Sequence, residues 1–287
     1  GGLFCAIVAP LLFDWTWEHP ILILSAAVLL PAITLITVNR NDPKVPYVMA
    51  GLGLLALVLG VASGVLEPDS FTVGKVVIAA VVIAIAAIVA GFRVPFLLAV
   101  AGLLTLNGGW YNAQLSFDGV RMRSYFGTYT VNSSESGRVR WLTHGTTMHG
   151  MQLLDNPTLP ISYYGANSGV GIASRRAEEL FGPKATIGVV GLGTGTLACY
   201  KKPGQDWHFF EIDPLMVEIA RERKIFSFLE KCAPDTQMHL GDARLTLAEQ
   251  PAGTFDLLAI DAFSSDSIPL HLLTKEAFAV YRRALKP

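Results

Sequence analysis

Charged residues are scarce in this sequence. They make up 16% of the 287 residues, against 52% hydrophobic residues, and the mean hydropathy is +0.45, well above the usual value for a water-soluble domain. The formal net charge of −1 leaves no basic surplus to neutralise phosphates, so nucleic acid is not an expected partner. The shortage is concentrated in residues 1–107, so we expect one part of the chain to require lipid and the other to be suited to water.

Cysteine is rare as well: the chain has only Cys5, Cys199 and Cys232. Their odd number, their wide spacing and the lack of a His or Cys at ligand spacing predict neither a disulfide framework nor a zinc site. We expect three ordinary buried thiols. His144 and His149 lie five residues apart, but no third ligand accompanies them, so no metal cofactor is predicted.

Long apolar runs fill the first part of the chain. A spanning helix needs about 20 apolar residues, and segments 21–38, 45–66 and 71–92 meet this length, while 94–106 is shorter. Buried helices of a soluble core are the alternative, but runs this long and this poor in charge disfavour it. We expect residues 1–115 to form a transmembrane helical region of about four to five segments that begins inside a longer protein.

From residue 116 the sequence changes to alternating polar and apolar residues with turns. Segments 123–131 and 138–142 predict two short antiparallel strands, which form a small β element over 116–160. Over 161–287, strands alternate with helices, which predicts a doubly wound parallel sheet covered on both faces. The expected strands are 186–190, 207–211, 236–240 and 256–260, with helices near 169–180, 196–200, 214–223 and 243–248.

A glycine-rich turn follows the first of these strands. Gly191, Gly193 and Gly195 allow the backbone to approach a ligand closely, and the helix that begins at Thr196 offers free N–H donors. This pattern alone is a weak signal.

Carboxylates follow the next three strands. Glu211 lies twenty residues after Gly191, where an acid can accept hydrogen bonds from the hydroxyls of a ribose. Asp242 and Asp261 end the third and fourth strands, at the same edge of the sheet. Each acid alone could equally be a helix N-cap, but the set favours one ligand crevice.

Together these motifs resemble the aminopropyltransferases of the spermidine synthase family, which have the class I methyltransferase fold, a Rossmann-like α/β fold. The resemblance covers residues 116–287 and is closest to bacterial spermidine synthase-like proteins fused to membrane helices. The motifs that carry it are Gly191–Gly195, Glu211–Asp213, Gly241–Ala243, Asp261–Phe278, Ser124–Gly127 and His144–Gln152.

The resemblance implies an adenosyl co-substrate, S-adenosylmethionine or its decarboxylated form, with Glu211 at the ribose and Asp242 at the adenine. It implies that Asp261 binds the amine and accepts a proton from it. The residue types also allow Asp261 and Asp266, with the rings of Tyr163, Tyr164 and Phe263, to form an anionic slot for a polyamine, and the alternative is that the tyrosines are packing residues. The expected catalytic residues are Asp261, Asp266 and Tyr164. The expected co-substrate residues are Gly191, Gly193, Thr194, Gly195, Glu211, Asp213, Asp242, Ala243 and Gln152.

Two departures from the family pattern concern the acceptor. Thr194 stands where spermidine synthases usually carry an Asp, and the region of His144, His149 and Gln152 lacks the usual acidic residues. The expected function is transfer of an aminopropyl group to an amine or polyamine by a membrane-anchored enzyme. A methyltransferase on the same scaffold, and a structural or binding subunit that has lost catalysis, are the alternatives.

The Lys and Arg residues beside the apolar segments balance if 94–106 spans the bilayer, so they set no orientation. If that segment does not span, the α/β domain lies on the side of Arg40, Lys44 and Arg93, which is the cytoplasm. Because the implied ligand is a cytosolic metabolite, we expect a bacterial inner-membrane protein with a cytoplasmic α/β domain. A homo-oligomer or a larger membrane complex is left open, and the family resemblance implies further strands after Pro287.

Overall fold

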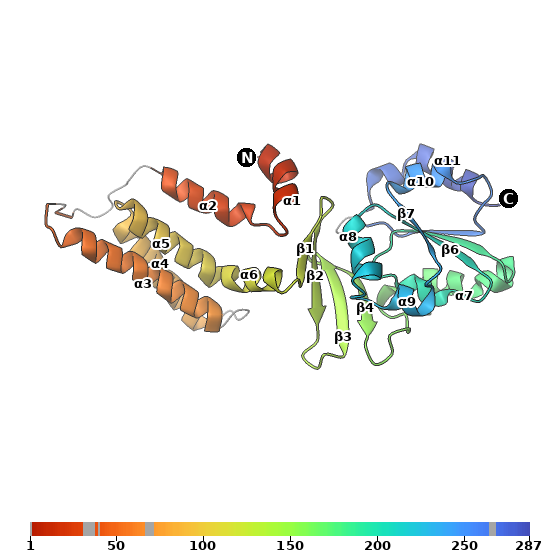
Figure 1. Cartoon of the computed structure of the whole chain (residues 1–287), viewed down its shortest axis with the longest axis horizontal. Coiled ribbons are helices and arrows are strands. Elements are labelled where there is room, and N and C mark those ends of the chain that lie inside the picture. Colours follow the sequence, from red (N-terminus) through yellow and green to blue (C-terminus); the bar gives the residue numbers. More distant parts are fainter. Residues whose placement is uncertain (1, 31–37, 40, 67–71, 264–267) are drawn as a thin grey trace. The chain divides into compact units, whose positions relative to one another are not determined.

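The computed structural model describes residues 2–30, 38–39, 41–66, 72–263 and 268–287. The chain forms two compact units, Gly1–Val120 and Arg121–Pro287 (Figure 1), here called the helical unit and the α/β unit. The division predicted after residue 115 falls inside helix α6 (Trp110–Phe117).

The helical unit consists of η1 (Phe4–Val8), α1 (Ala9–Leu12), α2 (Glu18–Leu29), α3 (Val45–Leu66), α4 (Val73–Val89), α5 (Arg93–Leu104), η2 (Thr105–Gly109) and α6. The apolar segment 45–66 is α3, and 71–92 contains α4. Residues 31–37 of the first predicted segment, and residue 71, lie outside the described residues. The short segment 94–106 is part of a longer helical run, because α5 continues through a kink at Asn107 and Gly108 into α6.

Small residues bring α3 and α5 together. A Cβ atom on Gly60 would collide with the carbonyl oxygen of Gly102, and one on Gly102 would collide with that of Ala56. Ala56 and Ala99 are fully buried in the same contact region. The two backbones can therefore approach only because these positions carry small side chains.

Two helical runs among the described residues are long and apolar enough to cross a membrane, Val45–Leu66 and Arg93–Phe117. Only 33% and 17% of their most apolar windows are buried. Length and composition alone define these two candidates, and a buried core helix would pass the same test.

A four-stranded antiparallel sheet begins the α/β unit. Its strands are β1 (Arg121–Arg123), β2 (Thr128–Ser133), β3 (Val139–His144) and β4 (Thr147–Leu153), in that spatial order. The sequence predicted only two strands here, because it missed the β1–β2 turn and the β3–β4 turn. The β3–β4 turn has Gly145 at a φ of +58°. A prediction from alternation alone does not detect turns this tight.

The second sheet is parallel, with the order β7-β6-β5-β8. Its strands are β5 (Thr186–Val190), β6 (Asp206–Glu211), β7 (Gln237–Leu240) and β8 (Leu257–Ile260), which agree with the predicted strands to within one residue. The order reverses between β5 and β8, and open α/β sheets bind ligands at such a point.

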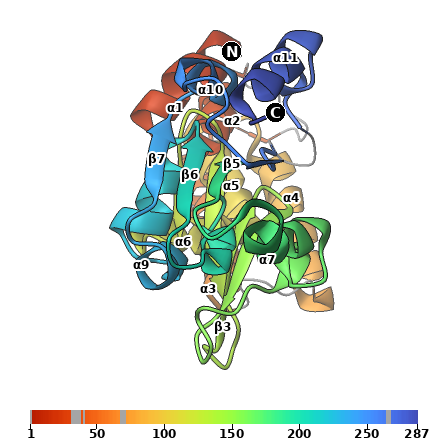
Figure 2. The same ribbon diagram turned by 90° about the vertical axis from the view of Figure 1, so that its right-hand side faces the viewer.

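Helices cover both faces of this sheet (Figures 1 and 2). Helices α7 (Gly169–Phe181) and α9 (Phe228–Cys232) pack on one face with Ile187, Val189, Trp207 and Phe209, while α10 (Ala243–Glu249) and α11 (Lys275–Ala284) pack on the other with Val190 and Phe210. Successive residues of a strand point to opposite faces, which explains this division. Short helical segments, η3 (Ser162–Tyr164), η4 (Thr196–Tyr200), α8 (Pro214–Val217), η5 (Glu218–Glu222) and η6 (Leu270–Leu272), complete the unit.

One expectation about the cysteines is wrong. Cys199, in η4, and Cys232, at the end of α9, form a disulfide with a Cα–Cα distance of 4.8 Å, while Cys5 is free. Their separation of 33 residues gave no signal, because only the packing of α9 on η4 brings the two side chains together.

Candidate active site

A cavity of about 900 Å³ lies at the carboxyl ends of β5, β6 and β8. Its wall also includes residues of the antiparallel sheet, namely Tyr129, His144, Thr147, Met148 and His149. This volume lies within the range of cofactor and ligand sites, roughly 300–1,000 Å³. The small sheet therefore forms part of the site.

The glycine turn is pressed between two neighbouring segments. Gly191 has a φ of +96°, and a Cβ atom there would collide with the carbonyl oxygen of Asp261. Gly193 has a φ of +53°, and its Cβ would lie 2.9 Å from the carbonyl oxygen of His149. Both conformations favour glycine, and neither position has space for a side chain.

The remaining two predicted residues of the turn lie behind the cavity wall. Thr194 is fully buried, and its hydroxyl is 2.9 Å from that of Thr196. A Cβ on Gly195 would contact Leu229 of α9. Neither Thr194 nor Gly195 lines the cavity.

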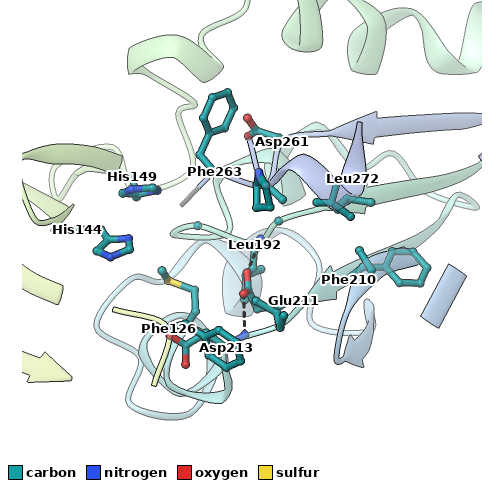
Figure 3. A pocket seen from close by; sticks show the side chains of 18 of the residues that line it. Phe126, His144, His149, Leu192, Phe210, Glu211, Asp213, Asp261, Phe263 and Leu272 are labelled. Carbon is teal, nitrogen blue, oxygen red and sulfur yellow. Dashed lines mark hydrogen bonds between the residues drawn. The ribbon is translucent and has the colours of Figure 1, made fainter. Parts of the chain in front are cut away.

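Glu211 is fixed beside the turn by two backbone donors (Figure 3). The N–H of Leu192 donates to its Oε2 and the N–H of Asp213 donates to its Oε1, both at 2.9 Å. Burial raises the pKa of this carboxyl group, while the two backbone hydrogen bonds oppose the shift. The carboxylate thus has a set orientation at the edge of the cavity.

Asp213 lines the cavity, but its oxygens are occupied. The hydroxyls of Ser124 and Tyr129 donate to its Oδ2 at 2.5 and 2.6 Å, and the N–H of Leu215 donates to its Oδ1 at 2.9 Å. Burial, followed by the nearby carboxylate, raises the pKa of the Tyr129 hydroxyl, which therefore stays protonated as a donor. Asp213 connects the small sheet to the start of α8.

Asp242 is an N-cap. Its Oδ1 accepts from the N–H groups of Arg244 and Leu245, at 2.8 and 3.4 Å, and its Oδ2 lies 3.2 Å from Nε2 of His271. Ala243 and His271 line the cavity, whereas Asp242 does not. The N-cap alternative that the sequence left open thus describes the contacts of Asp242.

Asp261 has one carboxylate oxygen without a partner. Its Oδ2 is buried and makes no hydrogen bond to any described residue, while the hydroxyl of Tyr164 hydrogen-bonds to the carboxyl group. Burial raises the pKa of Asp261 above its ordinary value of 3.8, although this hydrogen bond lowers it in part. Tyr164 is itself held by Tyr200, whose hydroxyl donates to the Tyr164 carbonyl at 2.6 Å.

Two histidines of the small sheet, His144 and His149, line the cavity. The ring of His144 lies 5.0 Å from that of Tyr129 and 5.4 Å from that of His149. Burial lowers the pKa of His144, so its ring is neutral at pH 7. No three His, Cys, Asp or Glu side chains in the described part of the chain are placed to hold a metal ion.

Gln152 does not line the cavity. It is 1% exposed, its amide donates to the carbonyl of Pro157 at 2.8 Å and to the hydroxyl of Ser227 at 3.1 Å, and its own carbonyl accepts from the N–H of Ser227. The amide fixes the segment before α9, so its assignment to the co-substrate is not supported by its position. Asp266 lies outside the described residues.

Comparison with known proteins finds relatives of part of the chain. No family model matches the chain. A polyamine aminopropyltransferase of Vibrio vulnificus is 34% identical over 106 residues, which is 35% of this chain and 34% of the relative. A crystal structure of a probable spermidine synthase from Corynebacterium glutamicum superposes with a TM-score of 0.50 at 18% identity, over 58% of this chain and 60% of that one. Spermidine synthase from Thermotoga maritima gives a TM-score of 0.43 at 19% identity, over 58% and 53%.

The chain is similar to the spermidine synthases. The predicted family resemblance is confirmed, and the α/β unit has the class I methyltransferase-like fold. The chain spans about a third of the length of the curated relative that it matches.

Several residues that line the cavity were not predicted as site residues. They are mostly apolar or aromatic, and they include Phe126, Met148, Phe210, Met216, Pro269, His271 and Leu272. An apolar residue carries no such signal in the sequence, because its role depends on which cavity the fold places it in.

Proposed function

We propose that the chain is a membrane-anchored aminopropyltransferase-like enzyme. In this proposal decarboxylated S-adenosylmethionine binds with its ribose at Glu211 and its sulfonium near Gly191 and Gly193, while an amine binds at Asp261. The main support is Asp261, which has a buried, unpartnered Oδ2 and lines the same cavity as the fixed carboxylate of Glu211. A carboxylate in that position would hold a cation and then accept its proton.

The chemistry requires little more than alignment. The lone pair of the acceptor nitrogen forms a bond to the aminopropyl carbon, the bond from that carbon to sulfur breaks, and its electron pair neutralises the sulfonium as a thioether. The proton lost from nitrogen passes to the Asp261 carboxylate. Tyr164, which hydrogen-bonds to that carboxyl group, orients it.

Membrane anchoring is the second part of the proposal. The low burial of the two apolar runs, 33% and 17% of their most apolar windows, supports lipid as their surroundings. The cytosolic origin of the proposed co-substrate supports a cytoplasmic face for the α/β unit in a bacterial inner membrane, whereas the Cys199–Cys232 disulfide, a bond rare in the reducing cytoplasm, opposes it. The helical unit would then be an anchor for the enzyme.

Calorimetry on the detergent-solubilised chain tests the co-substrate. We expect the decarboxylated form to bind more tightly than S-adenosylmethionine itself, and Glu211→Ala to abolish binding. Preference for intact S-adenosylmethionine would favour a methyltransferase. Binding of neither, by a chain whose unfolding transition is cooperative, would favour a structural or binding subunit.

A further inference from the structure

The cavity has a second side, beyond the residues proposed to hold the adenosyl group. Figure 3 shows Asp261 and Phe263 next to each other there, away from Asp213. Tyr163 and Tyr164 interact with Asp261 and line the cavity with it, so this carboxylate is surrounded by aromatic side chains.

Apolar rings at this side are partly open to solvent. Phe263 is 47% exposed and Tyr163 is 44% exposed, although both line the cavity. Exposed aromatic surface in a cavity gains free energy when a ligand covers it. A short dication such as a small diamine would cover little of it and would place its second charge among these rings.

Among the described residues, Asp261 is the one carboxylate on this side of the cavity lining. The oxygens of Glu211 accept from backbone N–H groups, and those of Asp213 accept from Ser124, Tyr129 and Leu215. The carboxyl group of Asp261, whose buried Oδ2 has no hydrogen-bond partner, therefore provides a place for one ammonium group.

We propose that the acceptor is a primary amine with an apolar substituent, an alkyl chain of several carbons or an aromatic ring. Its nitrogen lies at Asp261, and its substituent packs against Phe263 and Tyr163. This inference rests on the proposed aminopropyl transfer and specifies its acceptor. The bond changes are those given above, so the product is the secondary amine formed from the acceptor and the aminopropyl group.

A series of amines of increasing length tests the inference. With saturating decarboxylated S-adenosylmethionine, release of methylthioadenosine is measured for butylamine, hexylamine, octylamine and the diamine putrescine. We expect kcat/KM to rise about fourfold per added methylene until the side pocket is filled, and hexylamine to exceed putrescine. A higher kcat/KM for putrescine than for all three alkylamines would overturn the acceptor class.

Paired variants locate the effect. Phe263→Ser should lower kcat/KM for hexylamine by about tenfold or more, and by a clearly larger factor than it lowers kcat/KM for putrescine. Phe278→Ser is the matched control, since Phe278 is 58% exposed on α11 and does not line this cavity. Equal losses in both variants, or none in Phe263→Ser, would overturn the contact. Methylthioadenosine affinity by calorimetry checks that each variant is folded.

The two proposals fail in different ways. If decarboxylated S-adenosylmethionine does not bind to the chain, aminopropyl transfer fails and the acceptor class fails with it. If the co-substrate binds and putrescine is the better acceptor, only the acceptor class fails.

Discussion

The carboxyl group of Asp261 is buried. Burial favours its protonated form in the folded chain, whereas catalysis by this group requires its ionised form. Because its pKa lies above 3.8 in the folded chain, the group takes up protons more readily folded than unfolded. It contributes stability fully below its unfolded pKa, and this contribution is lost as pH rises through the folded pKa. A base, in contrast, works only when ionised, so activity requires the less stable charge state.

We therefore expect kcat/KM to rise with pH along an acid limb whose midpoint lies above 3.8. Asp261→Asn should lower kcat by about 10²- to 10⁴-fold and remove this limb, because the amide does not titrate. Its melting temperature should also vary less with pH. Retention of the wild-type rate and acid limb in Asp261→Asn would contradict the assignment. The measurements are pH–rate profiles and thermal unfolding.

A second residue-scale prediction concerns Glu211. Glu211→Gln replaces one acceptor oxygen with an NH2 group, which leaves the N–H of Leu192 or Asp213 without its acceptor. The expected destabilisation is about 1–3 kcal/mol, with weaker nucleoside binding. Glu222→Gln, at an exposed position of η5, should change neither the unfolding free energy nor the affinity. Equal unfolding free energies of the two variants in denaturant titrations would show that the two backbone hydrogen bonds to Glu211 do not stabilise the fold.

At this scale the sequence predicts which residues gather better than what each does. Glu211, Asp213 and Asp261 do line one cavity, because strand order places their loops together. Sequence spacing does not distinguish a carboxylate that faces a ligand from one that caps a helix. Asp242 and Asp213 both accept backbone N–H groups at helix starts, and only their side-chain contacts reveal this.

Helices α3 and α5 approach each other closely at Gly60 and Gly102. Gly60→Leu should destabilise the helical unit by about 1–3 kcal/mol, because the new side chain meets the backbone of Gly102 and forces the helices apart. Gly51→Leu is a matched control on the same helix, since a Cβ there meets nothing within 4 Å. Thermal unfolding in detergent measures both. Equal melting temperatures would mean that the helices do not pack in this way.

The disulfide joins η4 to α9. In the chain-entropy description, a closed loop of 33 residues stabilises the fold by about 3–4 kcal/mol. We expect dithiothreitol to lower the melting temperature of the wild-type chain and to have no effect on Cys199→Ala or Cys232→Ala. Thiol titration of the unreduced, unfolded chain provides the check: one free thiol is expected, and three would rule out the bond.

Element types followed from periodicity in most of the α/β unit. Strands 186–190 and 207–211 are buried, rich in branched or aromatic residues and bounded by glycine or acidic turns, so their predictions are confirmed. Two strands of the small sheet were missed, because β1 has only three residues and pairs with β2 without any run of apolar residues. The disulfide was missed because it depends on tertiary contacts alone.

For the whole molecule, the first prediction concerns lipid. Expressed in bacteria, the chain should sediment with the membranes and remain in the pellet after an alkaline carbonate wash. The reason is that the exposed apolar side chains of α3 and α5 are unfavourable in water and favourable in lipid. Release into the supernatant would show that these helices are not inserted.

Alkaline phosphatase fused after Pro287 should be inactive, since it folds only outside the cytoplasm; an active fusion would reverse the proposed orientation.

The link between the two units is short. Helix α6 ends at Phe117 and β1 begins at Arg121, and the three residues between them reach at most about 10 Å when fully extended. In the proposed membrane-anchored enzyme, this short linker would keep the α/β unit near the bilayer surface. The enzyme would then meet its acceptors by diffusion in two dimensions. A hydrophobic amine dissolved in the lipid would then reach the cavity at a far higher local concentration than the same amine in bulk solution.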